Sequence, residues 1–126
     1  MAIKQRDFWM PFTPSILEEY QSQYLKKSRF APYMIEAFDT KNEAQSFIAA
    51  LHPYDLTARP QTVNDWNPGW QAIIREFYKK TGVPAILNTS FNLHGFPICG
   101  TPEIAYWTFK NSALDGILLN NYLIER

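Results

Sequence analysis

The chain has 126 residues, of which 46% are hydrophobic and 16% aromatic, and twelve basic and twelve acidic residues give a formal net charge of zero. This length suits one domain with a real core, and the apolar content excludes an intrinsically disordered chain. The balanced charge argues against a broad nucleic-acid-binding surface. A single cysteine, Cys99, excludes an internal disulfide and a cysteine-rich zinc site.

The first predicted element is a helix over TPSILEEYQSQYLKK, residues 13–27, which Thr13 and Pro14 would begin. Its expected inner face is formed by Ile16, Leu17, Tyr20 and Tyr24. PYMIEAF, residues 32–38, reads as a strand. NEAQSFIAALH, residues 42–52, is ambiguous, because its alanines favour a helix whereas its second half is also typical of a strand.

LTARPQTV, residues 56–63, alternates between two faces, with Thr57, Arg59 and Gln61 on one of them. Its proline limits it to an edge strand or an irregular strand. NPGWQAIIREFYKKTG, residues 67–82, is the clearest helix, with Asn67 as its N-cap and Gly82 at its C-terminal end. Its apolar stripe is formed by Trp70, Ile73, Ile74, Phe77 and Tyr78.

The last elements are two strands with a helix between them. VPAIL, residues 83–87, is predicted as a buried strand, and DGILLN, residues 115–120, as another. TPEIAYWTFKNS, residues 101–112, is a predicted helix capped by Thr101. Its expected inner face is Ile104, Ala105, Thr108 and Phe109. Helices interspersed with strands indicate a layered α/β or α+β domain.

Small polar side chains follow the strand at residues 83–87, in LNTSFNLHG. If the chain stays extended, Asn88, Ser90 and Asn92 point together, and their groups suit the phosphate, ribose or amide of a ligand. The alternative is a polar turn between a strand and a loop.

Cationic side chains occur in two places. Arg59 offers a planar fork for a carboxylate or phosphate, with Gln61 beside it, although a solvated edge strand explains the same residues. Lys4 and Arg6 share one side of an extended amino-terminal segment and would form a cationic wall with Arg59. The alternative for that segment is an exposed, partly disordered terminus.

Other reactive side chains suggest no separate chemistry. His52 and His94 have no second histidine at ligand spacing, so no metal site is expected. Cys99 is expected to be a small buried apolar residue, because no activating base lies beside it. No signal peptide or apolar run of membrane-spanning length occurs in the sequence. We therefore expect a cytoplasmic protein with no membrane and no nucleic-acid partner.

The chain resembles the C-terminal domain of the O-carbamoyltransferases. The segments that carry the resemblance follow one another in this order: IKQRDFWMPFTPSIL, PYMIEAF, LHPYDLTARPQTVN and the long stretch from NPGWQ to NNYLI. The O-carbamoyltransferases are a family of nodulation and antibiotic-tailoring enzymes. The resemblance covers almost the whole chain. TGVPAILNTSFN, followed by G, PI and TPE, is its most specific part, and TARPQTV adds weight at its usual distance upstream.

The resemblance implies an α/β (α+β) fold similar to the YrdC fold, a twisted mixed sheet flanked by helices and truncated at the N-terminus. Residues 1–126 are then a single carbamoyltransferase C-terminal-like domain. Similar enzymes join carbamoyl phosphate and ATP, with Mg²⁺, into carbamoyl adenylate. A separate N-terminal transferase domain or chain, which carries an iron ion, then passes the carbamoyl group to a hydroxyl.

The resemblance also implies roles for residues. Lys4, Arg59 and Ser90 stand where family members hold phosphate and carbamoyl groups, and they are the expected catalytic residues. The residues expected to bind the nucleotide are Arg6, Gln61, Asn88 and Asn92. A lysine and an arginine fork stabilise a pyrophosphate leaving group without proton transfer, so Ser90 would donate a hydrogen bond and not act as a nucleophile.

The chain departs from the family pattern at several points. Met10 stands where an arginine is usual, which removes a phosphate contact worth about 1.5–3 kcal/mol. Phe96 stands where an acidic residue is usual, and Leu56 where a glycine usually follows the aspartate. We therefore expect incomplete activity without a transferase partner. The alternatives are a non-catalytic relative that binds nucleotide or phosphate, and a protein-interaction module.

Overall fold

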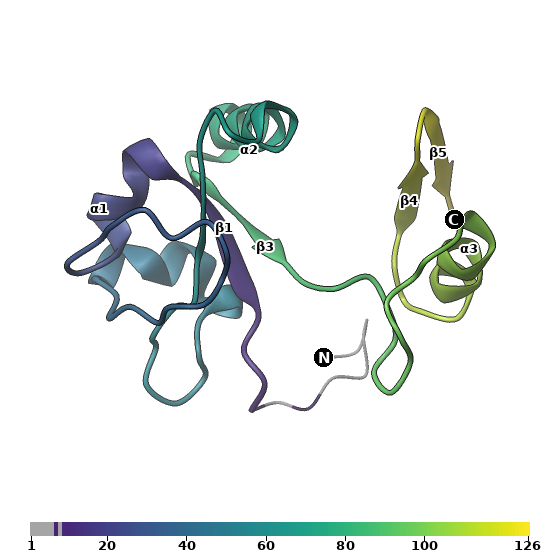
Figure 1. The fold of residues 1–126 in the computed structure, drawn as a ribbon, viewed down its shortest axis with the longest axis horizontal. Helices are drawn as coiled ribbons and strands as arrows, with labels where there is room; N and C mark the ends of the chain where they lie inside the picture. Colours follow the sequence, from purple (N-terminus) through teal and green to yellow (C-terminus); the bar gives the residue numbers. More distant parts are fainter. Residues whose placement is uncertain (1–6, 8) are drawn as a thin grey trace. The chain divides into compact units, whose positions relative to one another are not determined.

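The computed structural model describes residue 7 and residues 9–126, which form two compact units (Figure 1). The larger unit is Trp9–Thr89. The smaller unit contains Ser90–Arg126 and, among the described residues before Trp9, Asp7. No helix in the described part of the chain combines the length and the apolar character that a membrane crossing needs.

The larger unit is built on a three-stranded sheet in the order β2-β1-β3. β1 (Thr13–Leu17) lies in the centre, parallel to β2 (Gln61–Val63) and antiparallel to β3 (Ala85–Asn88). The sheet is therefore mixed, and helices accompany it, which confirms the predicted α+β class.

The prediction of a helix from residue 13 is wrong for its first five residues, which form β1. All five are buried, and both Ile16 and Leu17 are fully enclosed. An amphipathic surface helix keeps one polar face in water, whereas a central strand is covered on both faces. Helical structure starts only afterwards, with η1 (Glu18–Tyr20) and α1 (Gln21–Tyr24).

The predicted strand over residues 32–38 is also wrong. The chain turns at Pro32–Tyr33, Met34 has a positive φ of 58°, and only Phe38 makes an isolated bridge, to Ala58. The ambiguous segment that follows is helical, as η2 (Asn42–Ala50).

The alternation predicted for residues 56–63 is confirmed, since Ala58, Pro60 and Thr62 are buried while Arg59 is exposed. β2 is an edge strand of the sheet, as its proline required, and pairing starts directly after that proline.

α2 (Pro68–Thr81) begins and ends as predicted. The Asn67 Oδ1 accepts a hydrogen bond from the Trp70 N–H at 3.3 Å, and Gly82 ends the helix with a φ of 72°. Its predicted inward stripe is only partly buried: Ile74 is fully enclosed, but Ile73 is 54% exposed and Phe77 39%. Ile74 packs with Leu17 and Val63, so α2 covers one face of the sheet beside β1 and β2.

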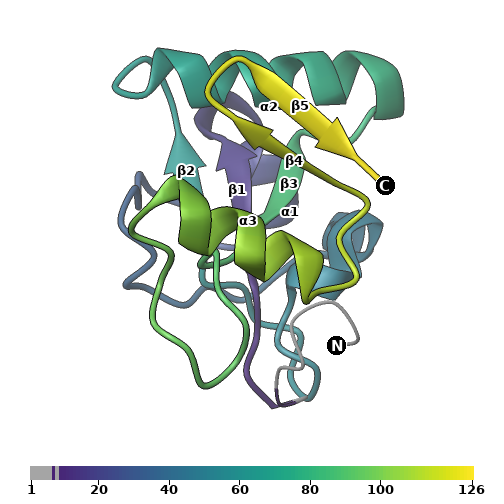
Figure 2. The same cartoon turned by 90° about the vertical axis from the view of Figure 1, so that its right-hand side faces the viewer.

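The smaller unit consists of α3 (Pro102–Lys110) and a hairpin of β4 (Gly116–Leu119) and β5 (Tyr122–Glu125), which lie side by side (Figure 2). Ala105 and Phe109 pack with Ile117 in its core. The predicted α3 and β4 are confirmed, whereas Ile104, predicted to face inward, is exposed. β5 was not predicted, because its residues are mostly exposed and carry no burial pattern.

Candidate functional site

A polar cluster of Ser15, Gln61 and Asn88 crosses the three strands of the sheet. The Ser15 hydroxyl donates to the Gln61 Oε1 at 2.6 Å, and the Asn88 Nδ2 donates to the same oxygen at 3.0 Å. Ser15 is fully enclosed, while Gln61 and Asn88 are half-buried. This arrangement leaves the amide groups of Gln61 and Asn88 in fixed orientations at a partly open surface.

The sheet register explains why these residues meet. Ser15 of β1 lies opposite Gln61 of β2. Asn88 of β3 lies opposite Thr13, which precedes Ser15 by two residues on β1. Side chains two residues apart on a strand share a face, so Ser15 lies on the same face as Leu17. The face that packs against α2 through Leu17 therefore continues into the polar cluster.

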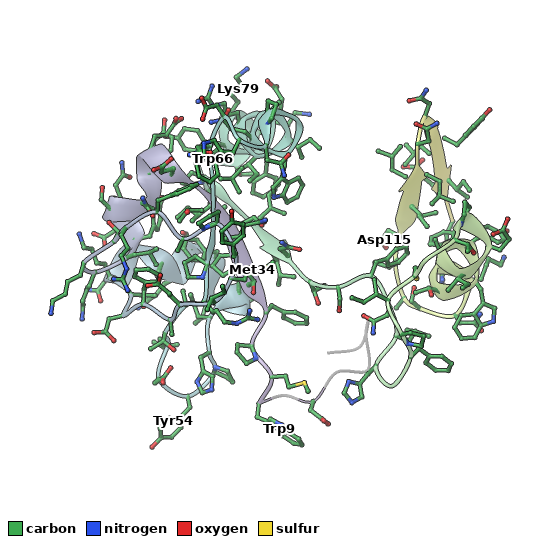
Figure 3. All side chains as sticks on the ribbon, viewed as in Figure 1. Trp9, Met34, Tyr54, Trp66, Lys79 and Asp115 are labelled. Atoms are coloured by element: carbon green, nitrogen blue, oxygen red, sulfur yellow. The ribbon has the colours of Figure 1, made fainter. Side chains whose placement is uncertain are left out.

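Arg59 lies two residues before Gln61, and its side chain is exposed. Its Nη1 donates a hydrogen bond to the carbonyl oxygen of Met34 at 2.6 Å, which anchors the left-handed turn at that residue. Met34 is labelled in Figure 3. Within the described residues, Arg59 makes no ion pair. A guanidinium has five N–H donors, so the remaining ones can still bind an anion.

The loop before Arg59 is held by Asp55. The backbone N–H and the hydroxyl of Thr57 donate to the Asp55 Oδ1 at 2.9 and 2.8 Å. These hydrogen bonds hold the pKa of the Asp55 carboxyl below its usual range. Leu56, between them, has a φ of 58°, a conformation that favours glycine. The turn thus keeps a left-handed residue at the position where the family pattern has glycine.

Ser90 and Asn92 form a second polar pair, in the smaller unit. The Ser90 hydroxyl donates to the Asn92 Oδ1 at 2.7 Å, and the Asn92 Nδ2 donates to the carbonyl oxygen of Phe96 at 2.6 Å. Phe96 packs its ring against Trp107, with 5.3 Å between centroids. An aromatic contact therefore occupies the position where the family pattern has an acidic side chain.

The structure brings Gln61 and Asn88 into one hydrogen-bonded cluster and Ser90 and Asn92 into another. Lys4 and Arg6 lie outside the described residues, so the convergence of Lys4, Arg59 and Ser90 on one anion stays a prediction. Ser15 was missed by the sequence analysis, which assigned it to a helix. A small polar residue alternating with apolar neighbours in TPSIL is the signal that a strand assignment would have used.

The other titratable side chains make local contacts. Cys99 packs against the core of the smaller unit but is half-buried and not buried as expected, and its Sγ lies 3.2 Å from the Thr108 Oγ1. The His52 Nδ1 lies 3.1 Å from the Asp55 Oδ1, and the His94 Nε2 lies 3.7 Å from the Asp7 Oδ2. In the described ranges, no group of three or more His, Cys, Asp or Glu side chains is arranged to hold a metal ion.

The fold and these polar clusters occur in a chain that matches the family described as Carbamoyltransferase C-terminus over residues 1–126. The chain belongs to this family, which confirms the resemblance drawn from the motifs.

Several longer proteins are similar to it. An uncharacterized protein of Methanocaldococcus jannaschii is 40% identical over 123 residues, covering 97% of this chain and 24% of that protein. Nodulation protein NolNO of Sinorhizobium fredii is 35% identical over 129 residues, covering 98% of this chain and 19% of that protein. Nodulation protein NolO of Bradyrhizobium diazoefficiens is 34% identical, with 99% and 24% covered. The chain thus spans about a fifth to a quarter of the length of these relatives.

Proposed function

We propose that this chain forms and binds carbamoyl adenylate, made from carbamoyl phosphate and ATP, for transfer to a hydroxyl by a separate transferase domain or chain. The observation that carries the proposal is the polar cluster of Ser15, Gln61 and Asn88, with Arg59 on the same strand face as Gln61. Membership of the carbamoyltransferase family supplies the reaction class.

The reaction needs anion binding more than proton transfer. Phosphate leaves carbamoyl phosphate as water takes its place, and an oxygen of the resulting carbamate attacks the α-phosphorus of ATP, which releases pyrophosphate. Negative charge builds up on both leaving groups. Fixed N–H donors and a guanidinium stabilise such charge without reorganising during the reaction.

Each residue then has a definite role. Arg59 binds a phosphate through the guanidinium nitrogens that do not hold Met34, and Lys4 approaches the same anion. The Ser90 hydroxyl, which donates to the Asn92 Oδ1 in the absence of ligand, would exchange that acceptor for a carbamoyl or phosphate oxygen when the ligand binds. Gln61 and Asn88 orient the nucleotide, together with Arg6 and Asn92. In this proposal Mg²⁺ enters bound to the ATP phosphates, which is how this ion usually binds nucleotide sites, and neutralises part of their charge.

The direct test is exchange of radiolabelled pyrophosphate into ATP. The chain is assayed alone and together with the preceding portion of the Sinorhizobium fredii NolNO protein, whose own C-terminal segment serves as the positive control. We expect exchange that requires carbamoyl phosphate and falls at least about tenfold in Arg59→Ala, because a charge-assisted hydrogen bond is lost. No exchange in either mixture, while the positive control is active, would overturn the proposal.

Two controls separate binding from folding. Arg75→Ala removes another exposed arginine, whose side chain forms a surface ion pair with Glu19 at 2.9 Å. This variant should leave pyrophosphate exchange unchanged. Arg59→Lys keeps a positive charge but not the planar fork, and we expect it to recover only part of the activity. If Arg75→Ala lowers exchange as much as Arg59→Ala, the assigned role of Arg59 is wrong.

A second candidate function is ligand binding without turnover. The contact of Phe96 with Trp107 favours it, because hydrocarbon replaces an acidic group of the family pattern. Calorimetric binding of ATP or carbamoyl phosphate in the absence of any exchange would select this candidate.

A further inference from the structure

The loop of residues 31–38 is hydrogen-bonded at both of its ends. At one end the Ala31 N–H donates to the Thr62 Oγ1 at 2.7 Å, and the Ala31 carbonyl oxygen accepts from the Thr62 N–H at 3.0 Å. At the other end the N–H of Phe38 donates to Ala58 at 2.8 Å, and the N–H of Ala58 donates back at 3.0 Å. These hydrogen bonds hold the loop beside β2.

Met34 lies between the two attachments, and its backbone has a φ of 58°. Residues other than glycine seldom adopt this left-handed conformation, and where they do, the surrounding structure enforces it, often at a functional site. In this conformation the Met34 carbonyl oxygen accepts the hydrogen bond from the Arg59 Nη1 at 2.6 Å. Because the loop is held at both ends, the carbonyl is the fixed partner, and the long exposed side chain of Arg59 is the group that becomes ordered.

The hydrogen bond engages one side of the Arg59 guanidinium. Nη1 lies on the Cδ side of the group, whereas Nε and Nη2 present two parallel N–H groups on the other side, the edge that can bind a phosphate through two hydrogen bonds. No described residue forms a hydrogen bond or an ion pair with that edge. The Met34 carbonyl thus holds Arg59 and leaves open the edge that an anion needs.

The Met34 side chain contacts the polar cluster. The Asn88 Nδ2 donates to the Gln61 Oε1 at 3.0 Å and lies 3.8 Å from the Met34 Sδ, within the distance of a hydrogen bond to sulfur. Arg59 precedes β2 and Asn88 ends β3. One half-buried residue therefore contacts both segments, Arg59 through its backbone and Asn88 through its side chain.

We propose that Met34 is a positioning residue for anion binding. Its carbonyl oxygen holds the Arg59 guanidinium so that the Nε–Nη2 edge binds a phosphate, and its thioether contacts Asn88, so that one turn holds both groups. A side chain that is already ordered loses less conformational entropy when the anion binds, which raises the affinity. This assignment rests on the proposed function for the role of Arg59 and adds the residue that sets its orientation.

The test measures binding of inorganic phosphate to the 126-residue chain by calorimetry. Met34→Val should weaken binding by about three- to tenfold, the cost of ordering one long side chain, because a β-branched residue disfavours the left-handed turn. Met34→Gly keeps the turn and the carbonyl and should retain most of the affinity. Asn120→Val is the matched control, because it strains another left-handed residue, with a φ of 54°, between β4 and β5. This control should bind phosphate like the parent.

A double variant separates positioning from general stability. If Met34 acts through Arg59, Met34→Val combined with Arg59→Ala should bind phosphate no more weakly than Arg59→Ala alone. Nuclear magnetic resonance adds a direct readout, since a guanidinium held by a hydrogen bond rotates slowly about its Nε–Cζ bond and gives separate Nη signals. We expect separate signals for Arg59 in the parent and in Met34→Gly, and merged signals in Met34→Val.

The positioning role is wrong if the parent binds no phosphate, if Met34→Val binds it as tightly as the parent, or if the double variant binds it more weakly than Arg59→Ala. The two proposals fail differently. Phosphate binding that depends on both Met34 and Arg59, without any pyrophosphate exchange, contradicts the adenylation and keeps the positioning role. Exchange that falls in Arg59→Ala but not in Met34→Val contradicts the positioning role and keeps the adenylation.

Discussion

Ser15 and Gln61 are 46 residues apart in the chain, and the hydroxyl of the first donates to the side-chain oxygen of the second at 2.6 Å. The bond joins the central strand to an edge strand below the surface, because Ser15 is fully enclosed. This bond fixes the orientation of the Gln61 amide. It therefore also fixes the direction in which the Gln61 N–H groups can donate to a nucleotide.

Replacing Ser15 with alanine should lower the free energy of unfolding by about 0.5–1.5 kcal/mol, the net value of one hydrogen bond. The loss is not larger because the Gln61 Oε1 keeps its bond from Asn88. Urea denaturation measures the change, and Ser46→Ala, at an exposed serine that bonds only to a nearby carbonyl, is the control. Equal stability of the Ser15 variant and the parent would show that the buried bond contributes nothing.

Ile74 and Ile73 are neighbours on α2 with opposite surroundings, one fully enclosed and the other 54% exposed. We expect Ile74→Ala to cost about 2–5 kcal/mol, because it opens a cavity against Leu17 and Val63. Ile73→Ala should change the stability by no more than about 0.5 kcal/mol. Chemical denaturation of both variants compares them directly, and similar losses would mean that α2 packs through a different face.

Leu56 holds a left-handed conformation that glycine adopts without strain. Both Leu56→Gly and Leu56→Ala remove the side chain beyond the Cβ, but only glycine also removes the Cβ that strains the left-handed backbone. The glycine variant should therefore be the more stable of the two, by about 1 kcal/mol. At Ile48, an exposed residue of η2, the same pair of substitutions should rank in the opposite order. Thermal denaturation gives both rankings, and the same order at the two positions would contradict the backbone argument.

Asp55 gives the loop before Arg59 a dependence on pH. Its pKa is lowered in the folded chain, first by the Thr57 backbone N–H and then by the Thr57 hydroxyl. A lowered carboxyl pKa means that the stabilisation is present above the pKa of the unfolded chain and is lost as pH falls through the folded value. Nuclear magnetic resonance titration should show the Asp55 pKa rising in Thr57→Val, which keeps the N–H and removes the hydroxyl. An Asp55 that titrates identically in both chains would contradict this account.

The sequence predicted those elements whose signals are local. Asn67, Pro68 and Gly82 determine the ends of α2 within the segment itself, and both ends fall where the capping residues placed them. Thr101 and Pro102 likewise determine where α3 begins. The departure from glycine at Leu56 did not predict the turn itself: Leu56 has a φ of 58°, the left-handed conformation that glycine adopts without strain.

β1 could not be predicted in the same way. Its five residues carry a helix-start signal at Thr13 and Pro14, but they form a strand because β2 and β3 pair with them on both sides. Those partners lie far along the chain, so the decisive interactions are tertiary and override local propensity. Because a helix was predicted over residues 13–27, Ser15 was not among the predicted site residues. Gln61 and Asn88 lay within or directly after segments that were predicted as strands.

The central claim is that Lys4, Arg59 and Ser90 meet around one anion. A crystal structure of the chain with ATP and carbamoyl phosphate bound tests it most directly. We predict that all three side chains lie within hydrogen-bonding distance of the same ligand, around its phosphate and carbamoyl groups. A ligand-bound structure in which these side chains face different directions, with packed hydrocarbon between them, would contradict the adenylation chemistry.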